Sequence, residues 1–262
     1  MLRTTNRHDT EPRATPPSAS SLEVMVGGVR LVLLADRAIH WPEQQTLIVT
    51  DTHFGKTATF RALGVAAPES VTASDLERLD RVIALTRPKR LLHLGDLLHS
   101  VRGTTSTVET SLRGWRDRHP SLEIVLVRGN HDRGIASLAK RLEIDVMAPG
   151  FVDGGVQFTH MPEEIKPDRA PLVMHGHLHP CIGLKRSKES VRLRGFILGP
   201  EHGKPGQAPA RVVLPAFGSF TGCRVVRLTS GERVVVTNDR ELIPLLTGGA
   251  RMERPPGTVL PT

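Results

Sequence analysis

The sequence predicts an α/β protein in which two β-sheets pack face to face with helices on the outside. Up to about residue 145, short apolar runs typical of buried strands alternate with amphipathic stretches typical of helices. This alternation indicates a parallel sheet with helical crossovers. Further along the chain, short strands follow one another with Gly-rich turns between them, which favours a second, largely antiparallel sheet.

The composition is that of an ordinary globular protein, with 39% hydrophobic and 24% charged residues in a chain of 262. No apolar run reaches membrane-spanning length, and the first twenty residues lack the hydrophobic segment of a signal peptide. We therefore expect a cytoplasmic protein with no membrane partner. The two cysteines, Cys181 and Cys223, have no metal-binding spacing and are interpreted as reduced thiols.

The chain divides into one predicted domain and two tails. Residues 1–21 are rich in Pro, Ser, Thr and Arg and predict a disordered tail, residues 22–247 a single domain, and residues 248–262 a loose end. A net charge of +8 is compatible with a polyanionic partner such as nucleic acid, although an Arg-rich genome composition explains it too. With 3% aromatic residues, we do not expect a base-stacking platform.

The first half predicts a hairpin, a buried strand and three helices. Gly27-Gly28 separates strands 22–26 and 29–33, because Gly permits the positive φ of a tight turn. A helix is expected to start with a capping box at Ser74 and to stop before Pro88. Further helices are expected at 107–118 and after Asp132. In the second half, the predicted strands are 156–159, 171–174, 191–193, 211–214, 223–228 and 233–236.

Four apolar runs end in polar residues that can bind a metal. Because ligands bind beyond the carboxyl ends of strands in open α/β sheets, we expect these residues to meet at one edge. They are Asp51 and His53 after strand 47–50, Asp96 after 91–94, Asn130, His131 and Asp132 after 124–127, and His177 and His179 after 171–174. His160 follows strand 156–159 in the same way. The sequence therefore predicts a metal site, with Asp96 at its centre.

The residue types indicate which metals the site suits. Asp51 and His53 lie two apart, so an extended strand would point both side chains to one face. Carboxylate and imidazole ligands suit Mn, Fe or Zn better than Ca or Mg. Asn130 offers a neutral carbonyl oxygen, and His131 with Asp132 forms an imidazole–carboxylate pair. Asp132 can also serve as the N-cap of the following helix, and the sequence leaves both roles open.

Taken in order, the segments 51–53, 95–99, 129–132, His160 and 176–179 resemble the motifs of the calcineurin-like metallophosphoesterases. The resemblance implies a four-layer sandwich of two mixed β-sheets flanked by helices. It also implies two divalent metal ions, for which Mn is preferred and Fe or Zn are alternatives. Two such ions about 4 Å apart repel by roughly 16 kcal/mol at an effective dielectric near 20, so an anion must lie between them.

The resemblance also implies a role for each residue. The first ion would be held by Asp51, His53 and His179, the second by Asn130, His160 and His177, and both by the bridging carboxylate of Asp96. His131 would be the acid that protonates the leaving oxygen, oriented by Asp132. Many members have Asp at the position of His99, and a His there is similar to the DNA-repair nuclease branch.

A narrower resemblance rests on the segments 34–42, 51–56 and 214–218. These are similar to bacterial ligase-associated DNA-damage-response endonucleases, which implies cleavage of DNA, a link to repair and association with a DNA ligase or helicase. Lys185, Arg186 and Lys188, followed by Arg192 and Arg194, could hold the DNA, although a solvated basic loop explains them equally well.

Two other functions remain as alternatives. One is a small-molecule phosphoesterase that hydrolyses a nucleotide or pyrophosphate. The other is a non-catalytic scaffold, which the intact set of ligand positions disfavours. The sequence leaves the oligomeric state open.

Overall fold

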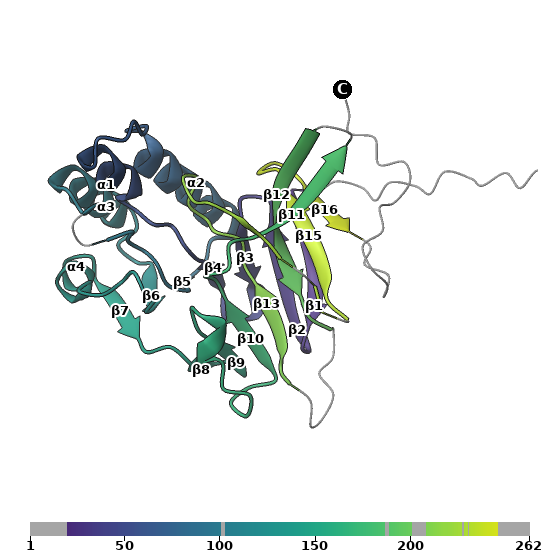
Figure 1. The fold of residues 1–262 in the computed structure, drawn as a ribbon. Coiled ribbons are helices and arrows are strands. Elements are labelled where there is room, and N and C mark those ends of the chain that lie inside the picture. The colour runs from purple at the N-terminus through teal and green to yellow at the C-terminus, as the bar shows by residue number, and fades with distance from the viewer. Residues whose placement is uncertain are drawn as a thin grey trace, which may run out of the picture.

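Two mixed β-sheets lie face to face, and helices cover the outer face of the first (Figure 1). The computed structural model describes residues 20–100, 103–186, 189–200, 208–226, 228–229 and 231–245, with the side chains of 184–190 excluded. The predicted tails lie outside these residues, apart from Ser20 and Ser21. The α/β class and the two mixed sheets are thus confirmed.

The first sheet has seven strands in sequence order. The first four are antiparallel neighbours, whereas the fourth to the seventh are parallel. The strands are β1 (Ser21–Val26), β2 (Val29–Leu34), β3 (Ala38–Trp41), β4 (Thr46–Val49), β5 (Arg90–His93), β6 (Glu123–Val127) and β7 (Ile144–Met147). The predicted hairpin around Gly27-Gly28 is present as β1 and β2.

The second sheet runs in the order β14-β11-β12-β13-β10-β9-β8, with β15 paired to β12 and β16. Its centre, β9-β10-β13, is parallel, and most other pairs are antiparallel. The strands are β8 (Phe151–Asp153), β9 (Val156–Phe158), β10 (Leu172–His175), β11 (Pro180–Arg186), β12 (Glu189–Leu198), β13 (Ala210–Val213), β14 (Arg224–Val225), β15 (Arg233–Thr237) and β16 (Leu242–Leu245). The predicted strand 223–228 is therefore much shorter, and 191–193 is part of a longer strand.

Alternating side chains of the parallel strands fill two separate cores. In β4, Leu47 and Val49 face the helices, whereas Ile48 faces the second sheet. β5 divides in the same way between Leu91 and Leu92. Because both faces of these strands are buried, their sequences are continuous apolar runs. The carboxyl ends of the strands are thereby held as rigid positions from which the following residues emerge.

The helices α1 (Lys56–Ala62), α2 (Val71–Thr86), α3 (Ser106–Arg118) and α4 (Ala136–Arg141) contribute to the core on the outer side of the first sheet. The predicted start of α2 at Ser74 is wrong, because the amide of Ser74 already donates to the carbonyl of Ser70 in the first turn. The stop before Pro88 is confirmed. None of the helices in the described residues is long and apolar enough to cross a membrane.

Candidate metal centre

The side chains predicted to bind metal follow the carboxyl ends of five strands, three in the first sheet and two in the second. Asp51 and His53 follow β4, Asp96 follows β5, and Asn130 and His131 follow β6. From the second sheet, His160 follows β9, while His177 and His179 follow β10. The two sheets thus present their ligands to one another across the edge of the sandwich.

Backbone turns, rather than extended strands, aim these side chains. Five of the ten described non-glycine residues with positive φ belong to the site: Asp51 (53°), His53 (47°), Asp96 (56°), His177 (65°) and His179 (43°). The expectation that a strand points Asp51 and His53 to one face is therefore wrong. A left-handed conformation costs on the order of 1–3 kcal/mol per residue, and such strain concentrates at functional sites.

Asp51, His53 and His179 form the first group of donors. Their ligand atoms lie within 4.8 Å of one another. The Oδ1 atom of Asp51 is 3.0 Å from Nε2 of His179 and 3.7 Å from Nε2 of His53. The other oxygen, Oδ2, accepts hydrogen bonds from the Thr50 hydroxyl and the His177 amide. One carboxylate oxygen is thus held in place, and the other is left facing the imidazoles.

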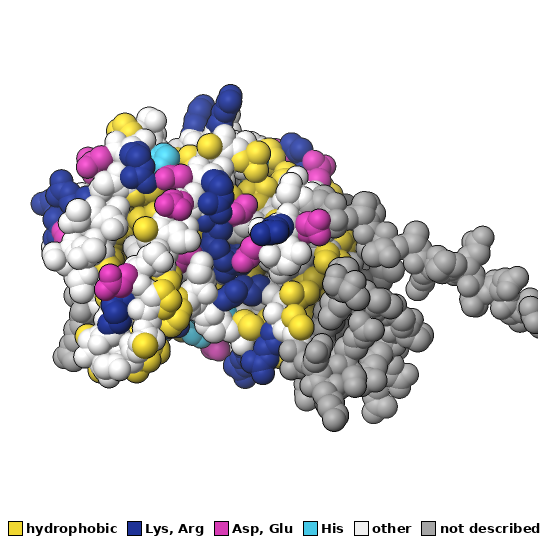
Figure 2. Space-filling model, turned by 90° about the horizontal axis from the view of Figure 1, so that it is seen from above, with side chains coloured by type: hydrophobic (Ala, Val, Ile, Leu, Met, Phe, Trp, Pro, Cys, Tyr) yellow, Lys and Arg dark blue, Asp and Glu magenta, His cyan; other side chains and the backbone are white. Residues whose placement is uncertain are grey.

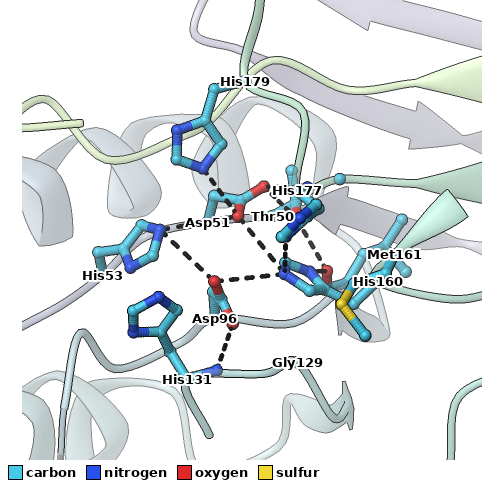
Figure 3. A network of polar contacts seen from close by, with 12 residues as sticks. Thr50, Asp51, His53, Asp96, Gly129, His131, His160, Met161, His177 and His179 are labelled. Carbon is cyan, nitrogen blue, oxygen red and sulfur yellow. Dashed lines mark hydrogen bonds and ion pairs between the residues drawn. The ribbon is translucent and has the colours of Figure 1, made fainter. Parts of the chain in front are cut away.

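Asp96, His160 and His177 form the second group, again within 4.8 Å. Nε2 of His160 lies 3.2 Å from Oδ2 of Asp96 and 3.3 Å from Nδ1 of His177. The same Asp96 oxygen is 3.7 Å from Nε2 of His53, a member of the first group. Asp96 therefore lies between the two groups (Figure 3).

The donor atoms fit a bound cation. Oδ1 of Asp51, both ring nitrogens of His53 and Oδ1 of Asn130 are buried without a hydrogen-bond partner. Burial lowers the pKa of His53 to about 3, so its ring is neutral and can donate a lone pair. Burial also disfavours a charge on His160, but Asp96 and Asp51 outweigh this and raise its pKa to about 9. These carboxylates need positive charge, which metal ions would supply.

Glycines make room for this arrangement. A Cβ atom on Gly176 would lie 2.0 Å from the Thr50 hydroxyl and 2.5 Å from Oδ2 of Asp51. A Cβ atom on Gly95 would lie 2.4 Å from Nδ1 of His160. Both positions therefore require a residue without a side chain, which explains the glycines that open the segments 95–99 and 176–179.

Asp132 does not form the predicted pair with His131. Its carboxylate is 1% exposed and accepts hydrogen bonds from the backbone amides of Asp96, Leu98 and Gly129. Instead, Nδ1 of His131 donates to the carbonyl oxygen of His99 at 2.7 Å. The carboxylate of Asp132 points toward the backbone of these loops. Three buried amides would lack an acceptor without it. It positions the Asp96 loop rather than the His131 ring.

Replacing Asp132 by Ala should destabilise the fold. We expect a loss of about 1–3 kcal/mol of unfolding free energy for each buried amide left without an acceptor. Urea denaturation of the metal-free protein measures it, with the exposed Asp117→Ala as control. Equal stability of the two variants would contradict this role.

His131 and His99 line the side of the centre next to His53. The rings of His131 and His99 stack with centroids 5.3 Å apart, and the ring of His131 is 5.2 Å from that of His53. With Nδ1 donating to a carbonyl, the neutral ring of His131 carries its proton there, and Nε2 is left for other partners. It can donate from Nε2 only as an imidazolium.

Three residues beside the centre escaped the sequence analysis as site residues. The Phe60 ring contacts both His99 and Phe220, at 6.2 and 5.8 Å between centroids. Burial is the main reason that the pKa of both His53 and His99 is lowered, and the nearby, half-buried Lys56 lowers it further. No sign of this cluster is visible in the sequence, because aromatic residues are few and Phe60 and Phe220 lie 160 positions apart. For Lys56, its place directly after the Asp51 segment was the available signal.

The basic residues predicted to bind nucleic acid are only partly described. Lys188 lies outside the described residues, and Lys185 and Arg186 are described as backbone positions of β11. Arg194 donates to the carbonyl and hydroxyl oxygens of Thr221. It therefore binds the protein's own loop.

One family model and one solved structure agree with this geometry. The family model described as calcineurin-like phosphoesterase matches residues 45–214. Among solved structures, the Pseudomonas putida nuclease MPE is 32% identical with a TM-score of 0.70, covering 86% of this chain and 100% of that one. The phosphoesterase Yfce from E. coli is 16% identical with a TM-score of 0.41, covering 76% and 96%. A search of curated proteins found no match. The chain belongs to the calcineurin-like phosphoesterase family of metal-dependent hydrolases.

Proposed function

We propose that the protein is a nuclease that hydrolyses phosphodiester bonds of DNA with two divalent ions, preferably Mn²⁺. The observation that carries this proposal is the pair of donor groups joined through Asp96. Asp51, His53 and His179 would hold one ion, and Asn130, His160 and His177 the other. Ions bound there polarise a phosphodiester and offset its charge.

His131 is placed to act as the general acid in this proposal. Its ring contacts His53, and its Nε2 is not used by the bond to the His99 carbonyl. As an imidazolium, it would give the Nε2 proton to the leaving oxygen. His99, stacked on it, restricts the orientation of the ring.

The surroundings of the centre support a nucleic acid over a small ester. Lys56 adds a cation, and Phe60 with Phe220 adds partly exposed aromatic faces next to His99. On the face seen in Figure 2, Lys and Arg side chains run through the middle with Asp and Glu side chains among them. An extended polyanion with bases can contact the cation of Lys56 and also stack on the Phe60 and Phe220 rings, whereas a mononucleotide can contact fewer of these groups. The likeness to the P. putida nuclease supports the same class.

Purified protein should hydrolyse bis-p-nitrophenyl phosphate and labelled DNA when Mn²⁺ is added, and should stop when a chelator is added. Activity that persists in chelator would refute the metal-dependent mechanism. Comparison of Mn²⁺, Fe²⁺ and Zn²⁺ identifies the metals that support turnover.

The salt dependence separates DNA from a small substrate. Several phosphate contacts predict a log–log slope of the binding constant against salt of about −0.7 to −0.9 per contact. A shallow slope together with efficient hydrolysis of nucleotides or pyrophosphate would favour the small-molecule alternative.

We also propose a role in DNA repair with a DNA ligase or helicase, which rests on the segments 34–42, 51–56 and 214–218.

A further inference from the structure

One loop without any metal ligand contacts two members of the first donor group. Loop 215–222 (Pro215–Gly222) connects β13 to β14. Its Phe217 amide donates to the carbonyl of Thr50 at 2.9 Å, and its Gly218 amide donates to the carbonyl of Asp51 at 3.1 Å. At the other end, Nδ1 of His179 donates to the carbonyl of Gly222 at 3.1 Å.

These contacts join ligands that come from opposite sheets. Asp51 follows β4 of the first sheet, and His179 follows β10 of the second. The contact with Asp51 is close, because a Cβ atom on Gly218 would lie 2.4 Å from the Thr52 carbonyl and 3.0 Å from that of Asp51. Among the described residues, the loop makes no direct hydrogen bond to Asp96, His160 or His177, and it reaches the second group only through Asp51, whose Oδ2 atom accepts the His177 amide. The loop therefore acts directly on the first donor group and only indirectly on the second.

Buried charges from distant elements hold this loop. The guanidinium of Arg37, 1% exposed in the turn between β2 and β3, donates to the carbonyls of Ala216 and Gly218 at 3.1 and 3.2 Å. Its Nε lies 2.8 Å from Oδ1 of Asp239, in the turn between β15 and β16. Arg37 has a positive φ of 68°, so its backbone is held in a turn that aims the side chain at the loop.

A second buried charge holds the middle of the loop from α2. The carboxylate of Asp75, 1% exposed, accepts hydrogen bonds from the amide and the hydroxyl of Ser219. It also pairs with Arg78 at 2.8 Å, and Arg78 donates to the Phe217 carbonyl while lying over the Phe217 ring. Buried ion pairs contribute little net stability compared with apolar side chains of the same volume. Their benefit here is the fixed position of the loop.

We propose that Arg37 and Asp75 are positioning residues for one of the two metal ions. Through loop 215–222, they hold Asp51 and His179 at the separation needed to bind that ion, and they act on the other donor group only indirectly, through the hydrogen bond from the His177 amide to Asp51. The proposal rests on the two-ion assignment of the proposed function. It also gives a physical role to segments 34–42 and 214–218, which contain no metal ligand.

The test is a calorimetric titration of metal-free protein with Mn²⁺, supported by electron paramagnetic resonance of the bound ions. Wild-type protein should bind two ions. In Asp75→Ala and in Arg37→Gln, one binding step should weaken by about 10–100-fold, as is typical when a residue that orients ligands is lost. The other step should weaken by clearly less, because the loop reaches that donor group only through Asp51. His179→Ala should weaken the same step, and adding Asp75→Ala to it should cause little further loss.

Conservative variants and a matched control separate positioning from general destabilisation. Ser219→Ala removes one of the donors to Asp75 and should weaken the same step by less, and Arg37→Lys should recover part of the affinity lost in Arg37→Gln. Arg90→Gln breaks an ion pair with Asp153 of 2.7 Å at the opposite end of β5 from Asp96, and should change neither step.

The outcomes are distinguishable. Equal weakening of both steps in Asp75→Ala and Arg37→Gln, or no change in either, overturns the positioning role while leaving the two-ion centre intact. Wild-type protein that binds no ion refutes the proposed function itself. If Asp75→Ala fails to fold by circular dichroism, Ser219→Ala and Arg37→Lys still decide the result.

Discussion

Replacing Asp96 by Asn should remove both metal ions. Its Oδ2 atom lies 3.2 Å from Nε2 of His160 and 3.7 Å from Nε2 of His53, so one carboxylate serves both donor groups. The amide keeps the shape but loses the negative charge that offsets repulsion between two dications. We expect the affinity to fall by more than the about 10–100-fold typical of residues that only orient ligands, and hydrolysis to fall with it. The metal content after dialysis measures the loss of affinity, and the turnover rate measures the loss of hydrolysis.

The control for Asp96→Asn is Asp80→Asn. Asp80 is a partly buried carboxylate of α2 that pairs with Arg118 and His119, away from the centre. This variant should keep both ions and full turnover. Two ions bound at full stoichiometry in Asp96→Asn would contradict the bridging role.

Replacing His131 by Ala should keep the metals and slow the reaction according to the leaving group. A general acid contributes typically about 10²–10⁴-fold when the leaving oxygen needs a proton, and little when it leaves readily as an anion. We therefore expect a large loss on DNA and a small one on bis-p-nitrophenyl phosphate. Steady-state rates on both substrates, with metal content measured in parallel, test this.

His119→Ala is the matched control for His131→Ala. His119 is a partly buried histidine that contacts Asp80 and Trp115 at the end of α3. It should leave the ratio of the two rates unchanged. An unchanged ratio in His131→Ala as well would remove His131 as the acid, and a loss of metal would reassign it as a ligand.

The strand ends were predictable because their signals are local. An apolar run that stops at Asp, Asn or His needs only a few neighbouring residues to be recognised, and five of these runs end at the centre. The helix predicted at 107–118 was equally clear, since Val108, Leu112 and Trp115 lie on one face, and α3 begins one residue earlier, at Ser106, with Thr105 as its cap. The start of α2 was not, because the capping pattern at Ser74 lies one turn inside the helix.

Roles that depend on contacts between distant residues could not be predicted. Asp132 beside His131 suggested a pair, but its carboxylate binds the amide of Asp96, 36 positions away. Low aromatic content argued against a stacking surface, yet Phe60 and Phe220 meet beside His99. Adjacency in the sequence does not determine where a side chain points once the backbone turns.

The sequence by itself determined the family and which residues can bind metal, because both are written in short motifs at the ends of apolar strands. Only the tertiary structure decided which contacts hold each group of donors in place. The amide of His177 reaches Asp51 across 126 positions, and Arg37 reaches Gly218 across 181. Such contacts arise from the packing of two sheets and from left-handed turns, which leave no periodic pattern in the sequence.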